Sequence, residues 1–171
     1  MKKSKFSKAV LKWSHVWSPR EDCTLNEINI LNEIFEDLYL KWDEDKKCFI
    51  LSYLDISNND LIRLSFLPPL IIKDTFECFN NKIESLEGGP IAALEYFCVG
   101  NKLKNLRGAP KTCGFFSCFN NPLEDFSVYT KPYDSYLAPD DADLIFIDPS
   151  LWTLEEFKKH EDVVKISDQY V

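Results

Sequence analysis

Six cysteines and two histidines are the side chains best suited to chemistry in this sequence. The cysteines are Cys23, Cys48, Cys78, Cys98, Cys113 and Cys118. An even number suits a disulfide framework, and thiolates together with imidazoles are the usual ligands of zinc. However, Cys78, Cys98 and Cys118 recur every twenty residues in apolar surroundings, without C-x-x-C pairs. His15 and His160 lie far from them along the chain. We therefore expect buried free thiols, with neither a zinc site nor a cysteine nucleophile paired with histidine.

One acidic cluster offers oxygen ligands for a divalent cation. Asp140, Asp141 and Asp143 stand together in the stretch PDDAD. Their spacing lacks the glycine of a calcium-binding loop and is more typical of a solvated turn. The sequence also has no glycine-rich loop that would hold a phosphate. We therefore expect a protein without catalytic residues, metal or cofactor.

The charge of the chain limits the classes of partner. The 171 residues carry 20 basic and 28 acidic side chains, for a net charge of −8. Direct binding along a nucleic acid backbone is not expected, because such affinity comes from lysines and arginines that neutralise phosphates. No apolar run reaches the roughly 20 residues that span a membrane, and lysines and serines interrupt any secretory signal. We expect a cytoplasmic protein.

The first twenty residues form a separate electrostatic unit. Their ionised side chains are all basic: Lys2, Lys3, Lys5, Lys8, Lys12 and Arg20. Apolar residues recur at spacings of three and four, which predicts an amphipathic helix; they are Phe6, Ala9, Val10, Trp13 and Trp17. Two interpretations are open. We favour an apolar face that packs on its own domain; the alternative is a basic helix that contacts an acidic partner or an anionic membrane surface.

A repeat organises the middle of the chain. Four windows align: LDISNNDLIRLSFLPP from residue 54, FECFNNKIESLEGGP from 76, YFCVGNKLKNLRGAP from 96 and FSCFNNPLEDF from 116. Their shared asparagines are Asn59, Asn81, Asn101 and Asn121, at intervals of 22, 20 and 20 residues. Apolar residues fill four columns around this anchor: Leu54, Phe76, Tyr96 and Phe116; Ile56, Cys78, Cys98 and Cys118; Leu61, Ile83, Leu103 and Leu123; Leu64, Leu86, Leu106 and Phe126. Such columns predict stacked coils that share one core.

The column pattern resembles the leucine-rich repeat, L-x-L-x-x-N-x-L, over residues 54–130, with a period at the short end of that family's range. Two branches of the family share it: short-repeat effector proteins of Gram-negative pathogens, and repeat proteins of bacteriophages and bacteria. The resemblance implies an α/β solenoid whose short strands form one parallel layer, about 4.8 Å apart. We expect the four asparagines to form a structural ladder, because an amide carries both the donors and the acceptor needed to bond backbone groups of neighbouring coils.

Both ends of such a stack need caps, which divides the chain into three segments. Residues 1–53 are expected to form an N-terminal cap of the basic helix, a second helix and a hairpin. The second helix is predicted over residues 24–39, because Thr24 and Glu27 have the spacing of a capping box. Residues 54–130 hold the four repeats. Residues 131–171 are expected to hold a degenerate repeat and a mixed C-terminal cap.

Alternation along each strand predicts the outward, concave surface of the repeats. The candidate partner-binding residues are Asp55, Ser57, Glu77, Phe79, Phe97, Val99, Ser117 and Phe119. Among them, Phe79, Val99 and Phe119 form an apolar stripe that Phe97 broadens. Exposed apolar stripes commonly mark interaction sites, although a terminal segment such as the N-terminal helix could also cover this one.

These observations favour a protein–protein interaction module that binds its partner through the concave face. The family resemblance implies a phage or bacterial factor that binds or inhibits a host protein. The alternative is an acidic inhibitor that imitates nucleic acid and blocks a DNA- or RNA-binding enzyme.

Overall fold

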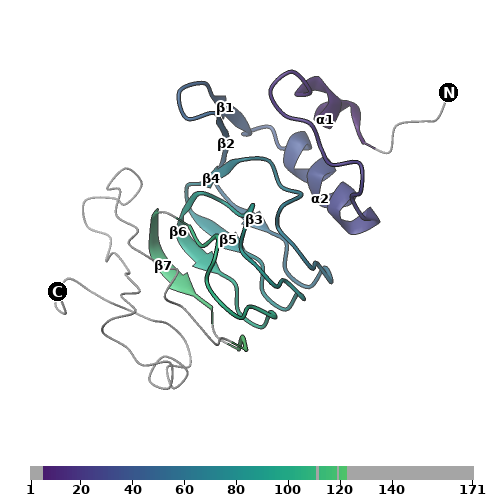
Figure 1. The fold of residues 1–171 in the computed structure, drawn as a ribbon. Helices are drawn as coiled ribbons and strands as arrows, with labels where there is room; N and C mark the ends of the chain where they lie inside the picture. Colours follow the sequence, from purple (N-terminus) through teal and green to yellow (C-terminus); the bar gives the residue numbers. More distant parts are fainter. Residues whose placement is uncertain (1–5, 111, 119, 123–171) are drawn as a thin grey trace.

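The computed structural model of the chain describes residues 6–110, 112–118 and 120–122. It is a parallel-strand β-solenoid of about three turns with few helices (Figure 1). The elements are α1 (Lys8–Lys12), α2 (Leu25–Glu36), β1 (Lys41–Asp43), β2 (Cys48–Leu51), β3 (Leu54–Asp55), β4 (Leu70–Ile72), β5 (Thr75–Glu77), β6 (Ala92–Phe97) and β7 (Thr112–Ser117). The predictions for Phe119, Leu123, Phe126, the PDDAD cluster, His160 and the cap at 131–171 lie outside the described residues.

The strands belong to one seven-stranded sheet, to which each coil contributes two consecutive segments that we name the first and second strand layers; in β6 and β7 the two segments form one continuous strand. The first strand layer contains β2, β4 and the beginning of β6 and β7; the second contains β3, β5 and the end of β6 and β7. All of these neighbours pair in parallel, and only the β1–β2 hairpin is antiparallel among the described pairs. The four aligned windows begin at the second layer. The strands of the first layer were therefore not predicted as part of the repeat. Three of them, β4, β6 and β7, begin just after a proline that ends a repeat window.

The four apolar columns face the shared core. Their described members are no more than 9% exposed: Leu54, Ile56, Leu61, Leu64, Phe76, Cys78, Ile83, Leu86, Tyr96, Cys98, Leu103, Leu106, Phe116 and Cys118. Because neighbouring coils stack in register, each column becomes a row of contacts, as in the ring pairs of Tyr96 with Phe76 and Phe116 at 4.7 and 5.5 Å between centroids. Burial of these rows is the main stabilising contribution to the stack.

The return side of each coil is a tight turn without a helix. Gly108 has φ of +82°, and an added Cβ would lie 2.2 Å from the backbone nitrogen of Glu87 in the preceding coil. Only glycine accepts both this conformation and this close approach. In the described residues the helices are confined to the N-terminal cap, so the expected α/β character does not extend into the coils.

A helix and a hairpin close the N-terminal end of the stack. α2 begins as predicted: the Thr24 side chain accepts from the Glu27 amide at 3.2 Å, and the Thr24 amide donates to the Glu27 carboxylate at 2.7 Å. The helix ends at Glu36, three residues earlier than predicted. The hairpin pairs β1 with β2.

The N-terminal segment packs on its own domain, the interpretation favoured from the sequence. α1 covers only Lys8–Lys12, and Val10 is fully buried. The Trp17 ring stacks on Phe35 of α2, and the Trp13 ring contacts Phe49 of β2 edge-on. α1 thus lies beside α2 at the N-terminal end of the stack, away from β5, β6 and β7 (Figure 1). Among the described residues, α1 therefore does not cover the part of the predicted apolar stripe on the coils of β5 and β6. Across the described residues, no helix is long and apolar enough to traverse a membrane.

Candidate functional site

From the second coil onward, the asparagine at each corner bonds the backbone of the preceding coil. The Asn81 side chain is the clearest case. Its Oδ1 accepts from the amides of Asn59 and Leu61 at 2.9 and 3.0 Å. Its Nδ2 donates to the carbonyls of Ile56 and Cys78 at 3.0 and 3.1 Å. One side chain thus satisfies four backbone groups in the two coils that it joins.

The next two coils repeat this arrangement. Asn101 accepts from the Ile83 amide at 3.1 Å and donates to the Cys78 carbonyl at 2.9 Å. Asn121 accepts from the Leu103 amide at 3.0 Å and donates to the Cys98 carbonyl at 2.9 Å. These side chains act in the scaffold, because their polar atoms point into the stack.

The residue before each ladder asparagine has a different structural role, because it adopts the left-handed backbone conformation of the corner. Asn58, Asn80 and Asn120 have φ of +57°, +53° and +53°, and Gly100 takes the same place in the third coil with φ of +67°. Asparagine and glycine are the residues that most readily adopt this left-handed conformation. The sequence predicted a role in the ladder for the second member of each asparagine pair but no separate role for the first. The signal was present, because glycine replaces only the first.

The second strand layer presents an outer face beside these corners. Strand pairing aligns Asp55, Glu77, Phe97 and Ser117 in one column, and Thr75, Glu95 and Phe115 in the next. We define the outer face by its described members that are at least partly exposed: Tyr53, Asp55, Thr75, Glu77, Phe79, Glu95, Phe97, Val99 and Phe115. Within each of the two columns, acidic side chains precede a phenylalanine along the stack.

The aromatic region of the outer face contains Phe79, Phe97, Val99 and Phe115, all partly exposed. The rings of Phe97 and Phe115 lie 5.3 Å apart between centroids, in a tilted contact. Phe115 was not among the predicted site residues. Alternation could have found it, because it stands two positions before the outward column that includes Ser117.

Two predicted contact residues are buried and offer little surface. Ser57 is 9% exposed and Ser117 is 3% exposed. The Ser57 hydroxyl accepts from the Phe79 amide of the next coil at 3.1 Å. The Ser117 carbonyl accepts from the Cys98 amide at 2.8 Å. A serine side chain is short, so larger neighbouring groups can bury it even on the outward side of a strand. The exposure predicted from alternation was therefore wrong at these two positions.

The acidic region of the outer face contains Asp55, Glu77 and Glu95. Two of these carboxylates accept hydrogen bonds from hydroxyl groups. Tyr53 Oη donates to a Glu77 carboxylate oxygen at 2.5 Å, and Thr75 Oγ1 donates to Glu95 at 2.9 Å. The hydrogen bond to the Glu77 carboxylate raises the pKa of Tyr53 to about 12. Within the described residues, no ion pair involves Asp55, Glu77 or Glu95.

The cysteines act as small apolar side chains in the interior of the protein. All six are free and buried. Burial raises the pKa of the thiols of Cys78 and Cys98 far above the ordinary range, and it raises the pKa of Cys113 to about 12. A thiol that stays protonated is a poor nucleophile and a poor metal ligand. Among the described residues, no three histidine, cysteine or acidic side chains are placed to hold a metal ion.

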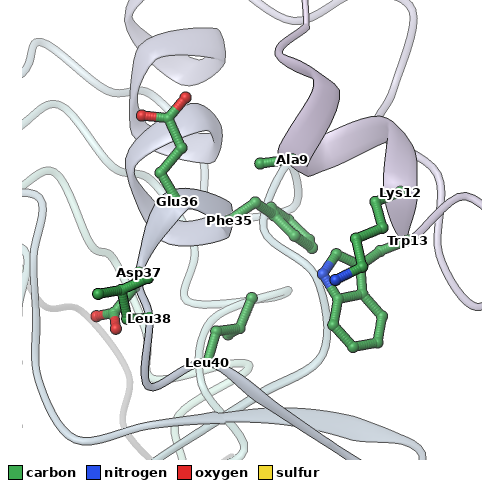
Figure 2. A pocket seen from close by; sticks show the side chains of 8 residues that line it. All are labelled: Ala9, Lys12, Trp13, Phe35, Glu36, Asp37, Leu38 and Leu40. Atoms are coloured by element: carbon green, nitrogen blue, oxygen red, sulfur yellow. The ribbon is translucent and has the colours of Figure 1, made fainter.

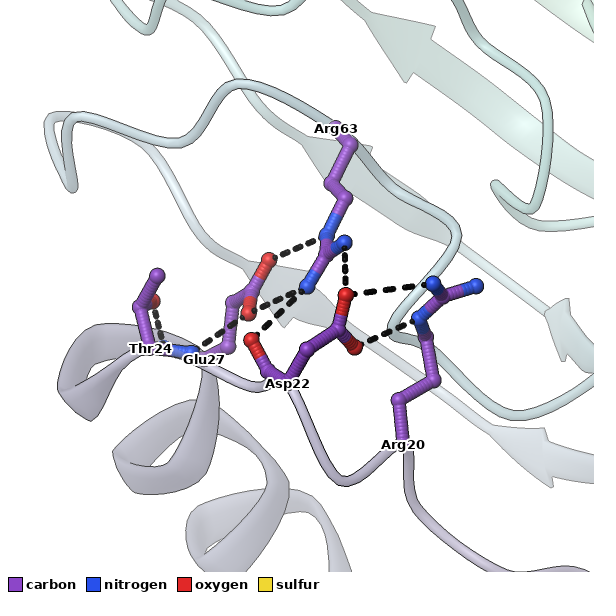
Figure 3. Close-up of polar contacts among 5 residues, drawn as sticks. All are labelled: Arg20, Asp22, Thr24, Glu27 and Arg63. Carbon is purple, nitrogen blue, oxygen red and sulfur yellow. Dashed lines mark hydrogen bonds and ion pairs between the residues drawn. The ribbon is translucent and has the colours of Figure 1, made fainter.

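A charged network joins the N-terminal cap to the first coil (Figure 3). Arg63 donates to both carboxylate oxygens of Glu27, at 2.9 and 3.1 Å, and to Asp22 at 2.9 Å. Glu27 is 1% exposed. Hydrogen bonds to Glu27 and Asp22 raise the pKa of Arg63, and the bonds from Arg20 and Arg63 lower the pKa of Asp22. Both carboxylate oxygens of Glu27 are engaged within the fold, so we assign the network to stability.

A pocket of about 400 Å³ lies between α1 and the end of α2 (Figure 2). Its wall mixes apolar side chains, among them Trp13, Phe35 and Leu40, with the charged Lys12, Glu36 and Asp37. The Lys12 ammonium lies 5.7 Å from the centre of the Trp13 ring. The Asp37 carboxylate points away from the hollow in this view. Ligand pockets need a few polar groups that converge on the ligand. This pocket shows no such arrangement, so the outer face is the stronger candidate.

Comparison with known proteins adds no identity: no family model, curated protein or solved structure matches the chain.

Proposed function

We propose that the chain is a protein-binding module built from short leucine-rich repeats, and that the outer face of its second strand layer holds the partner. The observation that carries this proposal is the group of partly exposed apolar side chains Phe79, Phe97, Val99 and Phe115 on adjacent strands. Apolar and aromatic groups gathered on one surface are typical of interaction sites, where a few aromatic anchors dominate the binding energy.

The assignment to short leucine-rich repeats rests on the repeated columns and the corner asparagine. Each coil places an apolar strand before the asparagine, and the amide bonds the preceding coil. The same resemblance favours a phage or bacterial factor acting on a host protein. A cysteine nucleophile is not favoured at Cys78 or Cys98, because burial raises the pKa of both thiols.

Affinity capture with matched variants tests the proposal. The wild-type chain and the variant Phe79→Asp are immobilised and exposed to extract from the native host. We expect a partner that is retained by the wild type and lost with Phe79→Asp, because a carboxylate at the centre of an apolar contact would be buried without a partner charge. The measurement is the amount of each co-purified protein by quantitative mass spectrometry.

Ile62→Asp is the matched control. Ile62 is 58% exposed and belongs to the return segment after the corner asparagine, outside the outer face. This variant should retain the partner, and circular dichroism should show that both variants are folded. Equal retention by Phe79→Asp and wild type would contradict the proposal.

A second candidate function is an acidic inhibitor of a nucleic-acid-binding enzyme. It is favoured by Asp55, Glu77 and Glu95, which have no ion-pair partner among the described residues. Such a complex should dissociate when salt is raised from about 0.1 M to about 1 M, because the screening length falls from about 10 to about 3 Å. A contact made mainly by aromatic groups should persist.

A further inference from the structure

Carboxylates and aromatic rings follow one another in the same columns of the outer face. Strand register places Asp55 opposite Glu77, and Glu77 opposite Phe97. In the neighbouring column, Glu95 stands opposite Phe115. Each of the two aromatic rings therefore has a carboxylate on the preceding strand.

The pair of Asp55 and Glu77 is unfavourable for the isolated chain. Like charges directly opposite one another on adjacent strands repel and reduce the stability of a sheet. Only neutral donors relieve this repulsion in the described structure: Tyr53 Oη donates to Glu77, and the Ser57 amide donates to Asp55 at 2.8 Å. A cation placed between the two carboxylates would interact favourably with both.

Resting on the proposed function, we propose that the outer face recognises a protein segment that carries an arginine or lysine next to an apolar side chain. The cationic group lies between Asp55 and Glu77, and the apolar side chain packs on Phe97 and Phe115.

Charge and shape together favour this occupant. An arginine guanidinium can bond two carboxylates through its forked donors and stack on a ring, and lysine offers the same charge on a long apolar stem. Phe97 lies on the strand next to Glu77, directly opposite it. A cation bound at the carboxylates is therefore within reach of a ring face, where cation–π attraction adds to the contact. A lone metal ion would leave the aromatic region uncovered.

Fluorescence anisotropy with a defined peptide tests the proposal on the full chain. The probe is a fluorescein-labelled peptide of alternating arginine and leucine. The double variant Asp55→Asn with Glu77→Gln should bind it about tenfold more weakly than wild type, because both charge contacts are removed while side-chain size is kept. Phe97→Ala should weaken the same probe more than it weakens a peptide of alternating arginine and glycine, which can lose only the cation–π contact.

The charge-matched control is the double variant Glu33→Gln with Glu84→Gln. Both glutamates lie outside the outer face and reach solvent at least partly, so the net charge changes equally. This variant should bind the probe as the wild type does. Equal weakening in the two double variants would overturn the proposal, because it would indicate general attraction to an acidic protein. Binding that calcium or magnesium ions displace, or self-association abolished by Asp55→Asn with Glu77→Gln, would also overturn it.

Two failures can be told apart. If Phe79→Asp abolishes capture of a partner but the carboxylate variants bind the peptide as the wild type does, the proposed function stands and this inference fails. If Phe79→Asp captures the same proteins as the wild type, the proposed function fails as well.

Discussion

The junction between the N-terminal cap and the first coil differs from the junctions between coils. The cap is joined by charges: Arg63 holds the buried Glu27 and the exposed Asp22. The coils are joined by neutral amides, as in the bonds of Asn81 to the Ile56 carbonyl and of Asn101 to the Cys78 carbonyl. Both the ion pair and the amide bonds satisfy buried polar groups. The amide bonds the preceding coil at Asn81, Asn101 and Asn121 alike, whereas the buried ion pair occurs where two unlike structures meet.

The difference has an energetic consequence. A neutral amide can be repeated along the stack at small cost, because it brings no charge into the core. A buried ion pair is favourable only while both partners are present, since one charge left alone in the interior costs several kcal/mol. The cap junction is therefore expected to be more sensitive to single substitutions than any one rung of the ladder.

The largest effect is expected from Arg63→Met. This variant leaves the buried Glu27 carboxylate without its cation, and we expect a loss of about 3 kcal/mol in the free energy of unfolding. Urea denaturation followed by circular dichroism measures it. Arg20→Met is the control, because the side chains of Arg20 and Asp22 are 50% and 56% exposed. It should change stability much less than Arg63→Met does, because an exposed ion pair contributes little; similar losses in the two variants would contradict the distinction.

A smaller loss is expected from Asn81→Ala. The substitution removes the bonds to the amides of Asn59 and Leu61 and to the carbonyls of Ile56 and Cys78. Unsatisfied buried backbone groups should reduce the free energy of unfolding by about 2 kcal/mol.

Asn59→Ala provides the comparison within the ladder. Asn59 lies in the first coil, and its Nδ2 donates to the Ser57 carbonyl of the same coil at 2.9 Å. Its loss should cost clearly less in the same urea experiment. Equal losses at Asn59 and Asn81 would show that the bonds between coils are not what the amide contributes.

The smallest effect concerns pH at the outer face. Because the Glu77 carboxylate raises the pKa of Tyr53 to about 12, the folded chain holds this proton more tightly than the unfolded chain, in which tyrosine titrates near pH 10. The contribution to stability is complete below about pH 10 and is lost as pH rises towards 12. The stability difference between wild type and Tyr53→Phe should shrink over this interval. Absorbance of tyrosinate should show a lower pKa for Tyr53 in Glu77→Gln.

The sequence predicted the register of the coils and their inward columns because these depend on local, repeated requirements. Every coil must place apolar side chains at the same positions to share a core, and each corner needs the same amide. These constraints recur at intervals of about 20 residues, so they can be read from the windows around Asn59, Asn81, Asn101 and Asn121. The capping box of Thr24 and Glu27 is local in the same sense.

Contacts between unlike segments were settled only by the tertiary structure. Arg63 meets Glu27 across 36 residues, and neither belongs to a repeated column. The burial of Ser57 and Ser117 and the contact of Phe97 with Phe115 likewise depend on how neighbouring side chains fill the space between strands. Periodicity predicts on which side of a strand a residue lies. How much of it reaches solvent is decided by the size of its neighbours on other coils, which stand far away in the chain.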